Sequence, residues 1–384
     1  MSRALPLFAA AAGLANGGAI AAEIESTEQG PVRVETVAQG LDYPWGFEFL
    51  PDGGLLVTER SGALRLVSAQ GLVSDPVAGV PEVDARGQGG LLDVALHPDF
   101  ARNRLVYLSY SERGEGGNST AVVRGVLSPD GRSLAEVERI FTQQPKLPST
   151  KHFGSRLVFD GKGHLFVTLG ERSSAEFREQ AQDLDSHLGK IVRLAEDGSV
   201  PEDNPFAETA GALPEIWSYG HRNIQAAAIN PETGQIWEIE HGPKGGDEIN
   251  IAEPGKNYGW PVVSRGVNYD GSPVGTGRRQ APGMEDPLYT WTPVIAPSGM
   301  AFYMGGAFPA WHGDLFVGGL ATTALVRLEL EGAKIAHEER LLEELGARIR
   351  DVAVGPEGAL YLLTDEDDGK VLRLRPAAEQ ASGG

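Results

Sequence analysis

Polar side chains gather in short segments rich in glycine or lying between apolar runs, and their types could transfer a proton and bind an anion. His152, in the segment Lys-His-Phe-Gly at 151–154, is the candidate proton acceptor, since a histidine works near neutral pH without a large pKa shift. Arg222 and Asn223 form a candidate clamp for an anion or a carbonyl group. The alternatives are a structural or solvated histidine and a salt bridge from Arg222 to one of the many carboxylates.

Two further segments carry amide and guanidinium groups. Gln88 stands between glycines in Gly-Gln-Gly-Gly at 87–90, where the backbone could approach a ligand closely and the amide offers both a donor and an acceptor. The alternative is a tight turn with a solvated amide. Arg348 and Arg350 are two residues apart and therefore share a strand face. Such a pair is costly unless an anion lies between them, and the alternative is a solvated strand edge.

A fifth segment suggests a cation site. In residues 240–248, Glu-His-Gly-Pro-Lys-Gly-Gly-Asp-Glu, proline and glycines bend the chain so that backbone carbonyls could converge on a hard cation. Asp247 and Glu248 would add carboxylates, and calcium favours such oxygen ligands. No EF-hand or zinc-ligand spacing occurs in the sequence, so any metal site must be of this irregular kind.

A diverged repeat lies between these segments. Each copy has a short alternating strand, a turn with Pro, Asp or Gly, and an apolar strand that ends near a polar residue or a glycine, which predicts a hairpin. Most copies continue into a further strand, as at 63–67, 190–194 and 370–374. The six copies lie at residues 47–59, 94–110, 157–170, 228–240, 300–319 and 352–365.

Three or four strands in each copy of about 60 residues make one propeller blade. We therefore predict an all-β fold, a six-bladed β-propeller of four-stranded antiparallel blades, as a single domain over 23–376. No helical periodicity alternates with the strands. The most helix-like stretch, 338–344, is charged and is expected at a blade edge. The strand at 32–37 is expected to complete the last blade and so close the ring.

The N-terminus and the composition bear on location and partners. Arg3, an apolar alanine-rich run and small residues up to position 22 predict a signal peptide at 1–22, and hence a periplasmic or secreted protein. Residues 377–384 are expected to be a flexible tail. No later segment is apolar enough to cross a membrane, so no membrane insertion is expected. The formal net charge of −20 argues against nucleic acid and anionic membranes as partners, and the chain has no cysteine.

In a propeller the inter-strand loops converge at one mouth of the central channel. The five polar segments each precede or follow a copy of the repeat, so we expect them to meet there. Taken together they predict a pocket for a polyanionic small molecule and calcium.

Several of these motifs occur in an order that resembles the soluble PQQ-dependent glucose/aldose sugar dehydrogenases. The resemblance runs from about residue 41 to 374, and the lack of long insertions is similar to the compact aldose sugar dehydrogenases. That family uses pyrroloquinoline quinone (PQQ) and calcium in a six-bladed propeller. The motifs that carry the resemblance are those at 87–90, 220–223, 240–250, 257–261 and 348–351.

The resemblance implies a role for each polar residue at the mouth. His152 is the general base that takes the proton of the sugar C1 hydroxyl while hydride passes to the quinone C5. Arg222 lies near the reacting quinone carbonyl, and Asn223 also binds the quinone. Gln88 lines the sugar and quinone site. The other implied ligands are Arg348 and Arg350 for the quinone carboxylates, the backbone carbonyls of Gly242 and Pro243 for calcium, and Glu248 and Tyr258 for a further, structural calcium.

Two positions depart from the family pattern, and two aromatic residues are candidates for stacking on the sugar. Lys151 stands where the larger glucose dehydrogenase has an aspartate, which puts the orientation of His152 in question. Ala321 stands where a quinone-contacting lysine is expected, and its loss would weaken cofactor affinity. Tyr289 and Trp291 are the candidates for aromatic residues that stack on the sugar.

The sequence therefore predicts a periplasmic quinoprotein oxidoreductase that oxidises aldose sugars at C1 to lactones, with PQQ as hydride acceptor. Its partners would be the sugar and an external electron acceptor, with no nucleic acid, and the protein would be a monomer or a dimer. Two alternatives remain at this point. One is a calcium-dependent propeller lactonase or hydrolase that uses metal-activated water, and the other is a non-catalytic propeller that binds a sugar or a protein.

Overall fold

Strands make up nearly all the regular structure of this protein. The computed structural model describes residues 23–377, so the predicted signal peptide at 1–22 and the tail from 378 onward lie outside the described residues. The helical segments of the described part are short: α1 (Phe100–Asn103), η1 (Arg178–Gln182), η2 (Pro309–Trp311) and η3 (Glu343–Leu345).

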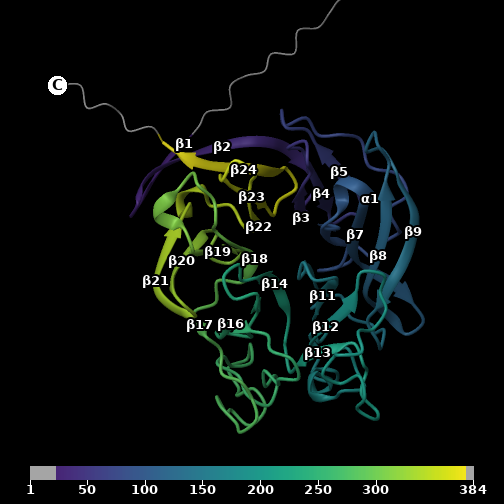
Figure 1. Cartoon of the computed structure of the whole chain (residues 1–384). Helices are drawn as coiled ribbons and strands as arrows, with labels where there is room; N and C mark the ends of the chain where they lie inside the picture. Colours follow the sequence, from purple (N-terminus) through teal and green to yellow (C-terminus); the bar gives the residue numbers. More distant parts are fainter. Residues whose placement is uncertain (1–22, 378–384) are drawn as a thin grey trace, which may run out of the picture.

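The strands form six antiparallel sheets, which are the blades of a propeller (Figure 1). Blade 1 has three strands, and blades 2 and 3 have four each. Their strands are β3 (Pro44–Phe49), β4 (Leu55–Glu59) and β5 (Leu64–Val67) in blade 1; β6 (Leu91–Leu96), β7 (Leu105–Gly114), β8 (Gly117–Leu127) and β9 (Leu134–Thr142) in blade 2; and β10 (Gly154–Phe159), β11 (His164–Leu169), β12 (Lys190–Ala195) and β13 (Ile216–Tyr219) in blade 3.

Blades 4 and 5 also have four strands, whereas blade 6 has five. Their strands are β14 (Ile224–Ile229), β15 (Ile236–Glu240), β16 (Asp247–Ile251) and β17 (Tyr289–Trp291) in blade 4; β18 (Pro297–Phe302), β19 (Leu315–Gly319), β20 (Leu325–Glu331) and β21 (Lys334–Leu341) in blade 5; and β22 (Ile349–Val354), β23 (Leu360–Thr364), β24 (Gly369–Pro376), β2 (Gly30–Leu41) and β1 (Glu23–Thr27) in blade 6.

The first strands of the blades form a closed inner ring. Each of β3, β6, β10, β14, β18 and β22 contacts the first strand of the next blade, and β22 contacts β3 to complete the circle. The six-bladed propeller is therefore confirmed. The strand number per blade differs from the predicted four only in blades 1 and 6, and the predicted edge segment at 338–344 is confirmed as the end of β21 and the turn η3.

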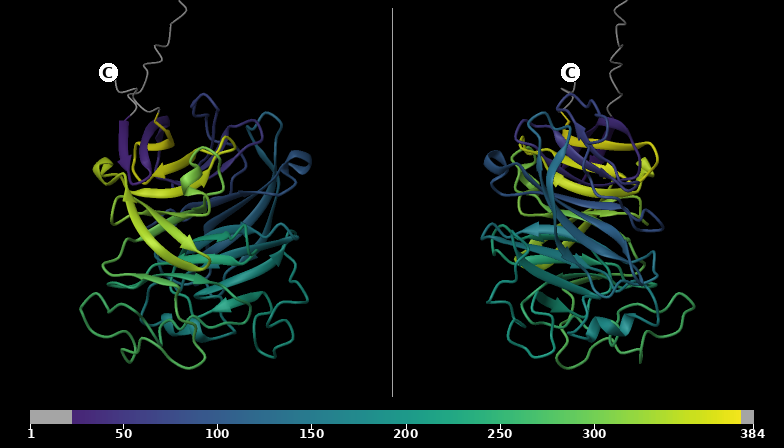
Figure 2. Two further views of the ribbon diagram at one scale, coloured as in Figure 1. Left: turned by 60° about the vertical axis from the view of Figure 1, so that its left-hand side comes forward. Right: turned by 90° about the vertical axis from the view of Figure 1, so that its right-hand side faces the viewer.

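The two ends of the described chain close the ring. Strand β2 pairs with β24 in antiparallel register, with Val32 opposite Pro376 and Val34 opposite Leu374. The N-terminal strands in purple and the C-terminal strands in yellow lie side by side in every view (Figures 1 and 2). The prediction that 32–37 completes the last blade is thus confirmed, and β1 adds one more strand outside β2.

The apolar core is divided among the blade interfaces. Six clusters of buried apolar side chains each join two neighbouring blades, so every blade is covered on both faces. The period-2 pattern of the repeat thus buries both faces of each sheet. Because no blade can bury its apolar faces alone, stability depends on the closed ring.

Each inner strand carries an irregularity in its register within its first few residues. Such bulges turn side chains away from the regular pleat, and here all six lie at the same end of the ring. Just beyond them, the Arg156 guanidinium binds Asp93 (2.9 Å) and Asp351 (3.2 Å) and lies 4.7 Å from the ring centre of Trp45. These buried ion pairs connect the inner strands of blades 2, 3 and 6.

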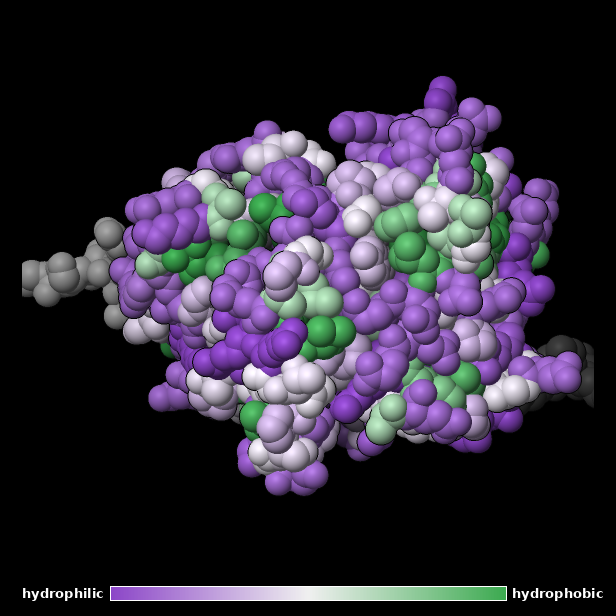
Figure 3. All heavy atoms as spheres, turned by 90° about the horizontal axis from the view of Figure 1, so that it is seen from below, coloured by the Kyte–Doolittle hydropathy of each residue, from purple (hydrophilic) through white to green (hydrophobic). Residues whose placement is uncertain are grey.

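Among residues 23–377, no helix is long and apolar enough to cross a membrane. The side of the molecule seen from below Figure 1 is mostly hydrophilic, and its apolar residues form separate groups (Figure 3). This face agrees with the acidic composition of the chain.

Ring closure can be tested with a charge placed in the closing strand. Val32 is buried in the cluster that joins blades 5 and 6, so we expect Val32→Asp to lower the free energy of unfolding by about 3 kcal/mol or more, measured by urea denaturation. Gln39→Asp is the matched control, because it adds the same charge at an exposed position of the same strand and should change stability by less than about 0.5 kcal/mol. Equal effects of the two substitutions would contradict closure through β2.

Candidate active site

The predicted site residues come together at the end of the ring where the inner strands begin. Gln88 precedes β6, His152 precedes β10, Asn223 precedes β14, and Arg348 and Arg350 lie at the start of β22. The segments that lead into blades 2, 3, 4 and 6 therefore carry these side chains. Their common position follows from the ring, since the starts of all six inner strands meet around the channel.

A cavity of about 190 Å³, here called the central cavity, opens at this end of the channel. Gln88, Arg348 and Arg350 line it as predicted. Arg60 and His241 line it as well, and neither was predicted as a site residue. The central cavity is thus lined by three guanidinium groups, two of them at the start of β22.

His152 is held rigidly beside the central cavity. Its backbone adopts a left-handed conformation with φ of 51°, and its N–H donates to Gln88 Oε1 at 2.7 Å. Its Nδ1 lies 2.7 Å from Glu171 Oε1, and both side chains are buried. With Nδ1–H donating to Glu171, the other ring nitrogen, Nε2, is left as the proton acceptor.

Electrostatics keep this imidazole neutral. Burial and the nearby Arg222 guanidinium lower the pKa of His152, while the hydrogen bond to Glu171 works in the opposite direction. A base must be deprotonated before it can accept a proton, so a lowered pKa suits this role. Lys151, the departure noted above, is exposed, and the orientation of His152 comes from Glu171 instead.

Glu171 was not predicted, although a signal for it exists in the repeat. In several blades an acidic residue stands at the end of the second strand or just after it. Its side chain binds the segment that begins the first strand of the same blade. Glu59 accepts from the backbone N–H of Asp42 at 2.9 Å in blade 1. Glu171 and Asp365 occupy the corresponding places in blades 3 and 6.

Asp365 explains how two arginines share one strand face. Its Oδ2 accepts from Arg348 at 2.8 Å and from Arg350 at 2.9 Å, so the anion expected between them is a side chain of the protein. One carboxylate faces two guanidinium groups, and the buried Nε atoms of Arg350 and Arg60 have no hydrogen-bond partner among the described residues. The central cavity therefore has donors and positive charge to offer an anionic ligand.

Arg222 binds the turn predicted to hold a cation, through the carbonyls of Gly242 and of His241, which lines the central cavity. Its Nη1 donates to the backbone carbonyls of His241 (2.9 Å) and Gly242 (2.7 Å), and its guanidinium carbon lies 5.1 Å from the ring centre of Trp260. Glu240 accepts hydrogen bonds from the backbone N–H groups of Arg222 and Asn223. The carboxylate of Glu240 thus holds the loop that carries both predicted quinone-binding residues.

The turn itself is built to present backbone carbonyls. Asp247 Oδ1 accepts from the N–H of Gly242 at 2.8 Å, and its Oδ2 accepts from the N–H groups of Ile295 and Ala296. Asp247 is therefore an anchor for the turn. A Cβ atom at Gly242 would lie 2.2 Å from Gly246 O, so only glycine fits there.

The four predicted metal residues line one small cavity of about 20 Å³, here called the turn cavity. Burial and the charges of Glu240 and Glu238 raise the pKa of Glu248 well above its usual value. A cation bound here would compensate the negative charge of these neighbouring carboxylates. The hydroxyl of Tyr258 is engaged by the backbone of Ile251 and Glu253. The four residues are Gly242, Pro243, Glu248 and Tyr258.

Two sequence-based assignments need correction or refinement. Tyr289 and Trp291 lie on β17, the outermost strand of blade 4, where both donate to Glu338 (3.0 and 2.8 Å), so neither lines the central cavity. The phenyl and indole side chains that line the central cavity are instead those of Phe153 and Trp45. Ala321 is exposed beside Leu320, which does line the central cavity, so a lysine at 321 would start from the edge of the site.

Comparison with known proteins agrees with the fold. The family model described as Glucose / Sorbosone dehydrogenase matches residues 41–373. The chain therefore belongs to the glucose/sorbosone dehydrogenase family, and it is a dehydrogenase.

More particular likenesses lie within that family. The chain is 49% identical over 348 residues to the aldose sugar dehydrogenase YliI of Escherichia coli (strain K12), with 90% of this chain and 93% of the relative covered. A solved glucose dehydrogenase is 54% identical with a TM-score of 0.87, covering 90% and 99% of the two chains. The PQQ-bound form of an aldose sugar dehydrogenase from Streptomyces coelicolor is 31% identical with a TM-score of 0.74, covering 90% and 98%.

The environment of His152 gives a prediction about its protonation. Since Arg222 lowers the pKa of His152 and Glu171 raises it, Arg222→Gln should raise that pKa and Glu171→Gln should lower it. Titration of the imidazole by NMR in the cofactor-free protein measures both shifts. Arg113→Gln, which changes an exposed arginine bound to Asp84, is the control and should leave the His152 resonance unchanged. Shifts of the opposite sign in either variant would contradict the arrangement.

Proposed function

We propose that the protein is a periplasmic quinoprotein oxidoreductase that oxidises aldose sugars at C1 to lactones, with PQQ as hydride acceptor and calcium as its metal. The observation that carries this proposal is the juxtaposition of a partnered, neutral His152 with a cavity lined by Arg60, Arg348 and Arg350. The likeness to a PQQ-bound aldose sugar dehydrogenase supports the choice of cofactor. The predicted signal peptide supports the location.

The residues of the central cavity fit a polyanionic cofactor. Arg348 and Arg350 would hold carboxylates, because they bring two guanidinium groups to one face and share a single internal counter-ion. Arg60, with an unpartnered Nε, would add a third contact. Gln88, whose carbonyl already orients His152, would line the same space.

His152 would carry the proton chemistry. Its Nε2 accepts the proton of the sugar C1 hydroxyl, while Nδ1–H stays bonded to Glu171, which fixes the tautomer and stabilises the imidazolium that forms. PQQ, when bound, would supply the hydride acceptor, and calcium would act as a Lewis acid on it. Arg222 and Asn223 would orient that carbonyl, held in turn by Glu240.

The carbonyls of Gly242 and Pro243 would hold the cofactor's calcium, and Glu248 with Tyr258 would contribute to a structural calcium. Their oxygen donors suit a hard cation. The Gly242 carbonyl accepts a hydrogen bond from the Arg222 guanidinium, so this position accepts positive charge. An external electron acceptor would reoxidise the cofactor, and the active protein would be a monomer or a dimer.

A reconstitution assay tests the proposal. Purified protein with calcium should reduce a dye acceptor in the presence of glucose only after PQQ is added, and the product should be the lactone, identified by mass spectrometry or by NMR. His152→Ala should lower turnover by roughly 10²–10⁴-fold. His164→Ala is the matched control, since His164 pairs with Asp160 at the opposite end of the same blade and should retain full activity.

Other outcomes of this assay decide against the proposal. Absence of PQQ-dependent dye reduction, with no change in the PQQ absorption spectrum on mixing, would contradict cofactor use. Lactone hydrolysis without PQQ would favour the hydrolase alternative. Full turnover in the His152→Ala variant would remove this residue from the role of base.

The position of Ala321 allows a gain-of-affinity test. A lysine there would reach from the rim beside Leu320 toward an anionic cofactor, so Ala321→Lys should tighten PQQ binding by about tenfold, the value of one charge-assisted hydrogen bond. Fluorescence titration of the protein with PQQ in calcium measures the change. Ala336→Lys, the same substitution on the exposed edge strand β21, is the control and should leave the affinity unaltered. Equal or weaker binding in Ala321→Lys would contradict this placement.

A further inference from the structure

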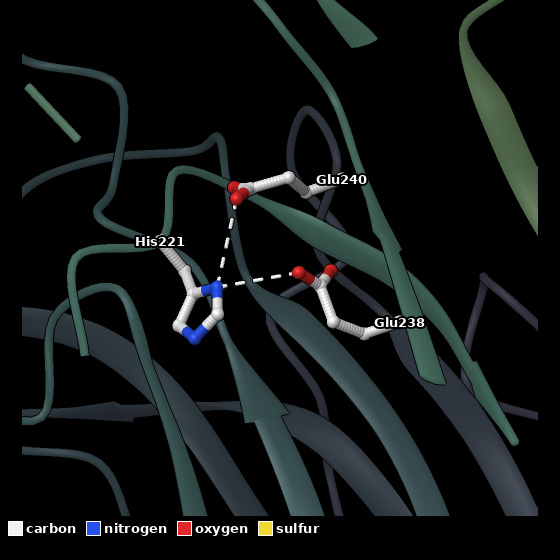
Figure 4. A group of neighbouring side chains, drawn as sticks. All are labelled: His221, Glu238 and Glu240. Carbon is white, nitrogen blue, oxygen red and sulfur yellow. Dashed lines mark ion pairs between the residues drawn. The ribbon is translucent and has the colours of Figure 1, made fainter. Parts of the chain in front are cut away.

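A second cluster of residues that could bind a metal ion lies in blade 4, next to the loop that carries Arg222 and Asn223. It consists of His221, Glu238 and Glu240, which are almost completely buried. The ligand atoms of the three side chains all lie within 4.8 Å of one another. Figure 4 shows the imidazole and both carboxylates pointing toward one another.

The distances in this cluster are unlike those of the other histidine–carboxylate pairs in the described chain. His221 Nδ1 lies 3.4 Å from Glu238 Oε1 and 3.5 Å from Glu240 Oε1, beyond the usual length of a charge-assisted hydrogen bond. The other pairs measure 2.7–3.1 Å, and they are formed by His97, His152, His164, His187 and His337.

Two polar atoms of the cluster are left without partners. His221 Nδ1 and Glu238 Oε2 are buried and make no hydrogen bond among the described residues. A buried polar group without a partner is costly, so such atoms need an explanation. Here Nδ1 points into the space between the two carboxylates (Figure 4).

The two distances from His221 to the carboxylates match those between ligands that share a metal ion. Ligand atoms at about 2.0–2.2 Å from a tetrahedral zinc ion lie roughly 3.3–3.6 Å from one another. The two distances from His221 Nδ1 fall within that interval. His221 Nε2 lies 2.9 Å from Ser218 Oγ, an arrangement that leaves Nδ1 free as a ligand when Nε2–H donates to the hydroxyl.

We infer that His221, Glu238 and Glu240 form a binding site for a divalent transition-metal ion such as zinc, separate from the calcium sites proposed above. The neutral imidazole favours zinc over calcium, which takes oxygen ligands. Two ionised carboxylates balance the charge of the ion, and a water molecule would complete the tetrahedron. Binding displaces the proton that otherwise sits on Nδ1 into solvent.

The surrounding hydrogen bonds hold the ligands in place. Glu238 Oε1 accepts from Asn250 at 2.7 Å, and Glu240 Oε2 accepts from the backbone of Arg222 and Asn223. The ion would therefore join strand β15 to the loop before β14. Its role would be structural, since it would hold this loop at the edge of the central cavity.

A proton is the competing occupant of the cluster. Burial lowers the pKa of His221, but attraction to Glu238 and Glu240 outweighs it and raises the pKa to about 9 when no ion is present. An imidazolium between two carboxylates would also account for a buried triad. The experiment must therefore separate a bound ion from a bound proton.

Metal content after zinc loading tests the inference without using PQQ or sugar. The protein is stripped with a chelator, dialysed against zinc with excess calcium, passed through a desalting column and measured by inductively coupled plasma mass spectrometry. We expect about one zinc per chain in the wild type and a loss of that zinc in Glu238→Gln and in His221→Gln. Glu59→Gln, at the corresponding strand end in blade 1, is the matched control and should retain the zinc.

Thermal unfolding and crystallography cover the case in which a variant fails to fold. Zinc should raise the melting temperature of the wild type, and an anomalous difference map at the zinc edge should place the ion between the three side chains. A stripped wild-type protein that binds no zinc, or an ion located on Gly242 and Glu248, would overturn the inference and leave the proton as the occupant.

Discussion

Carboxylates at the ends of second strands hold the mouth of this propeller together. Four blades place an acidic residue where the second strand ends, and each one binds the segment that begins the first strand of the same blade. The mouth is buried, so polar groups gathered there need partners. Because both members of each pair belong to one hairpin, the register of that hairpin positions the site. These residues are Glu59, Glu171, Glu240 and Asp365.

This arrangement produces a positive cavity in an acidic protein. The chain carries a formal charge of −20, yet three guanidinium groups line the central cavity and only one carboxylate pairs with Arg348 and Arg350. Beyond it, Arg156 is neutralised by Asp93 and Asp351 and connects three blades. Local positive charge in a low-dielectric channel attracts anionic ligands.

Blade 4 shows the opposite imbalance. Glu238, Glu240 and Glu248 lie on adjacent strands, and burial raises the pKa of Glu238 to about 7. Such an excess of buried carboxylates is stabilised by cations. The oxygen donors around Gly242 suit calcium, whereas the imidazole of His221 adds a nitrogen ligand that suits zinc. The proposed zinc ion would hold the loop before β14, and the proposed calcium would hold the turn after β15.

The sequence by itself determined the repeat and therefore the fold. Alternating apolar residues and turn residues are local signals, so the six blades, the closing strand at 32–37 and the meeting of Gln88, Arg348 and Arg350 at one mouth could be predicted. The family resemblance then assigned the roles. The strand counts of blades 1 and 6 could not be foreseen, because edge strands depend on packing rather than on pattern.

Only the tertiary structure decided which residues are partners. The acidic residue repeated at the ends of second strands was a signal for Glu171, but only the structure shows that it binds His152, 19 residues away. Arg60 reaches the central cavity from another blade, and no spacing in the sequence indicates that position. Tyr289 and Trp291 resemble sugar-stacking residues in type, but their place on an outer strand removes them from the site. Hairpins form between residues that are close in sequence. A buried charge instead pairs with whichever group the closed ring places next to it.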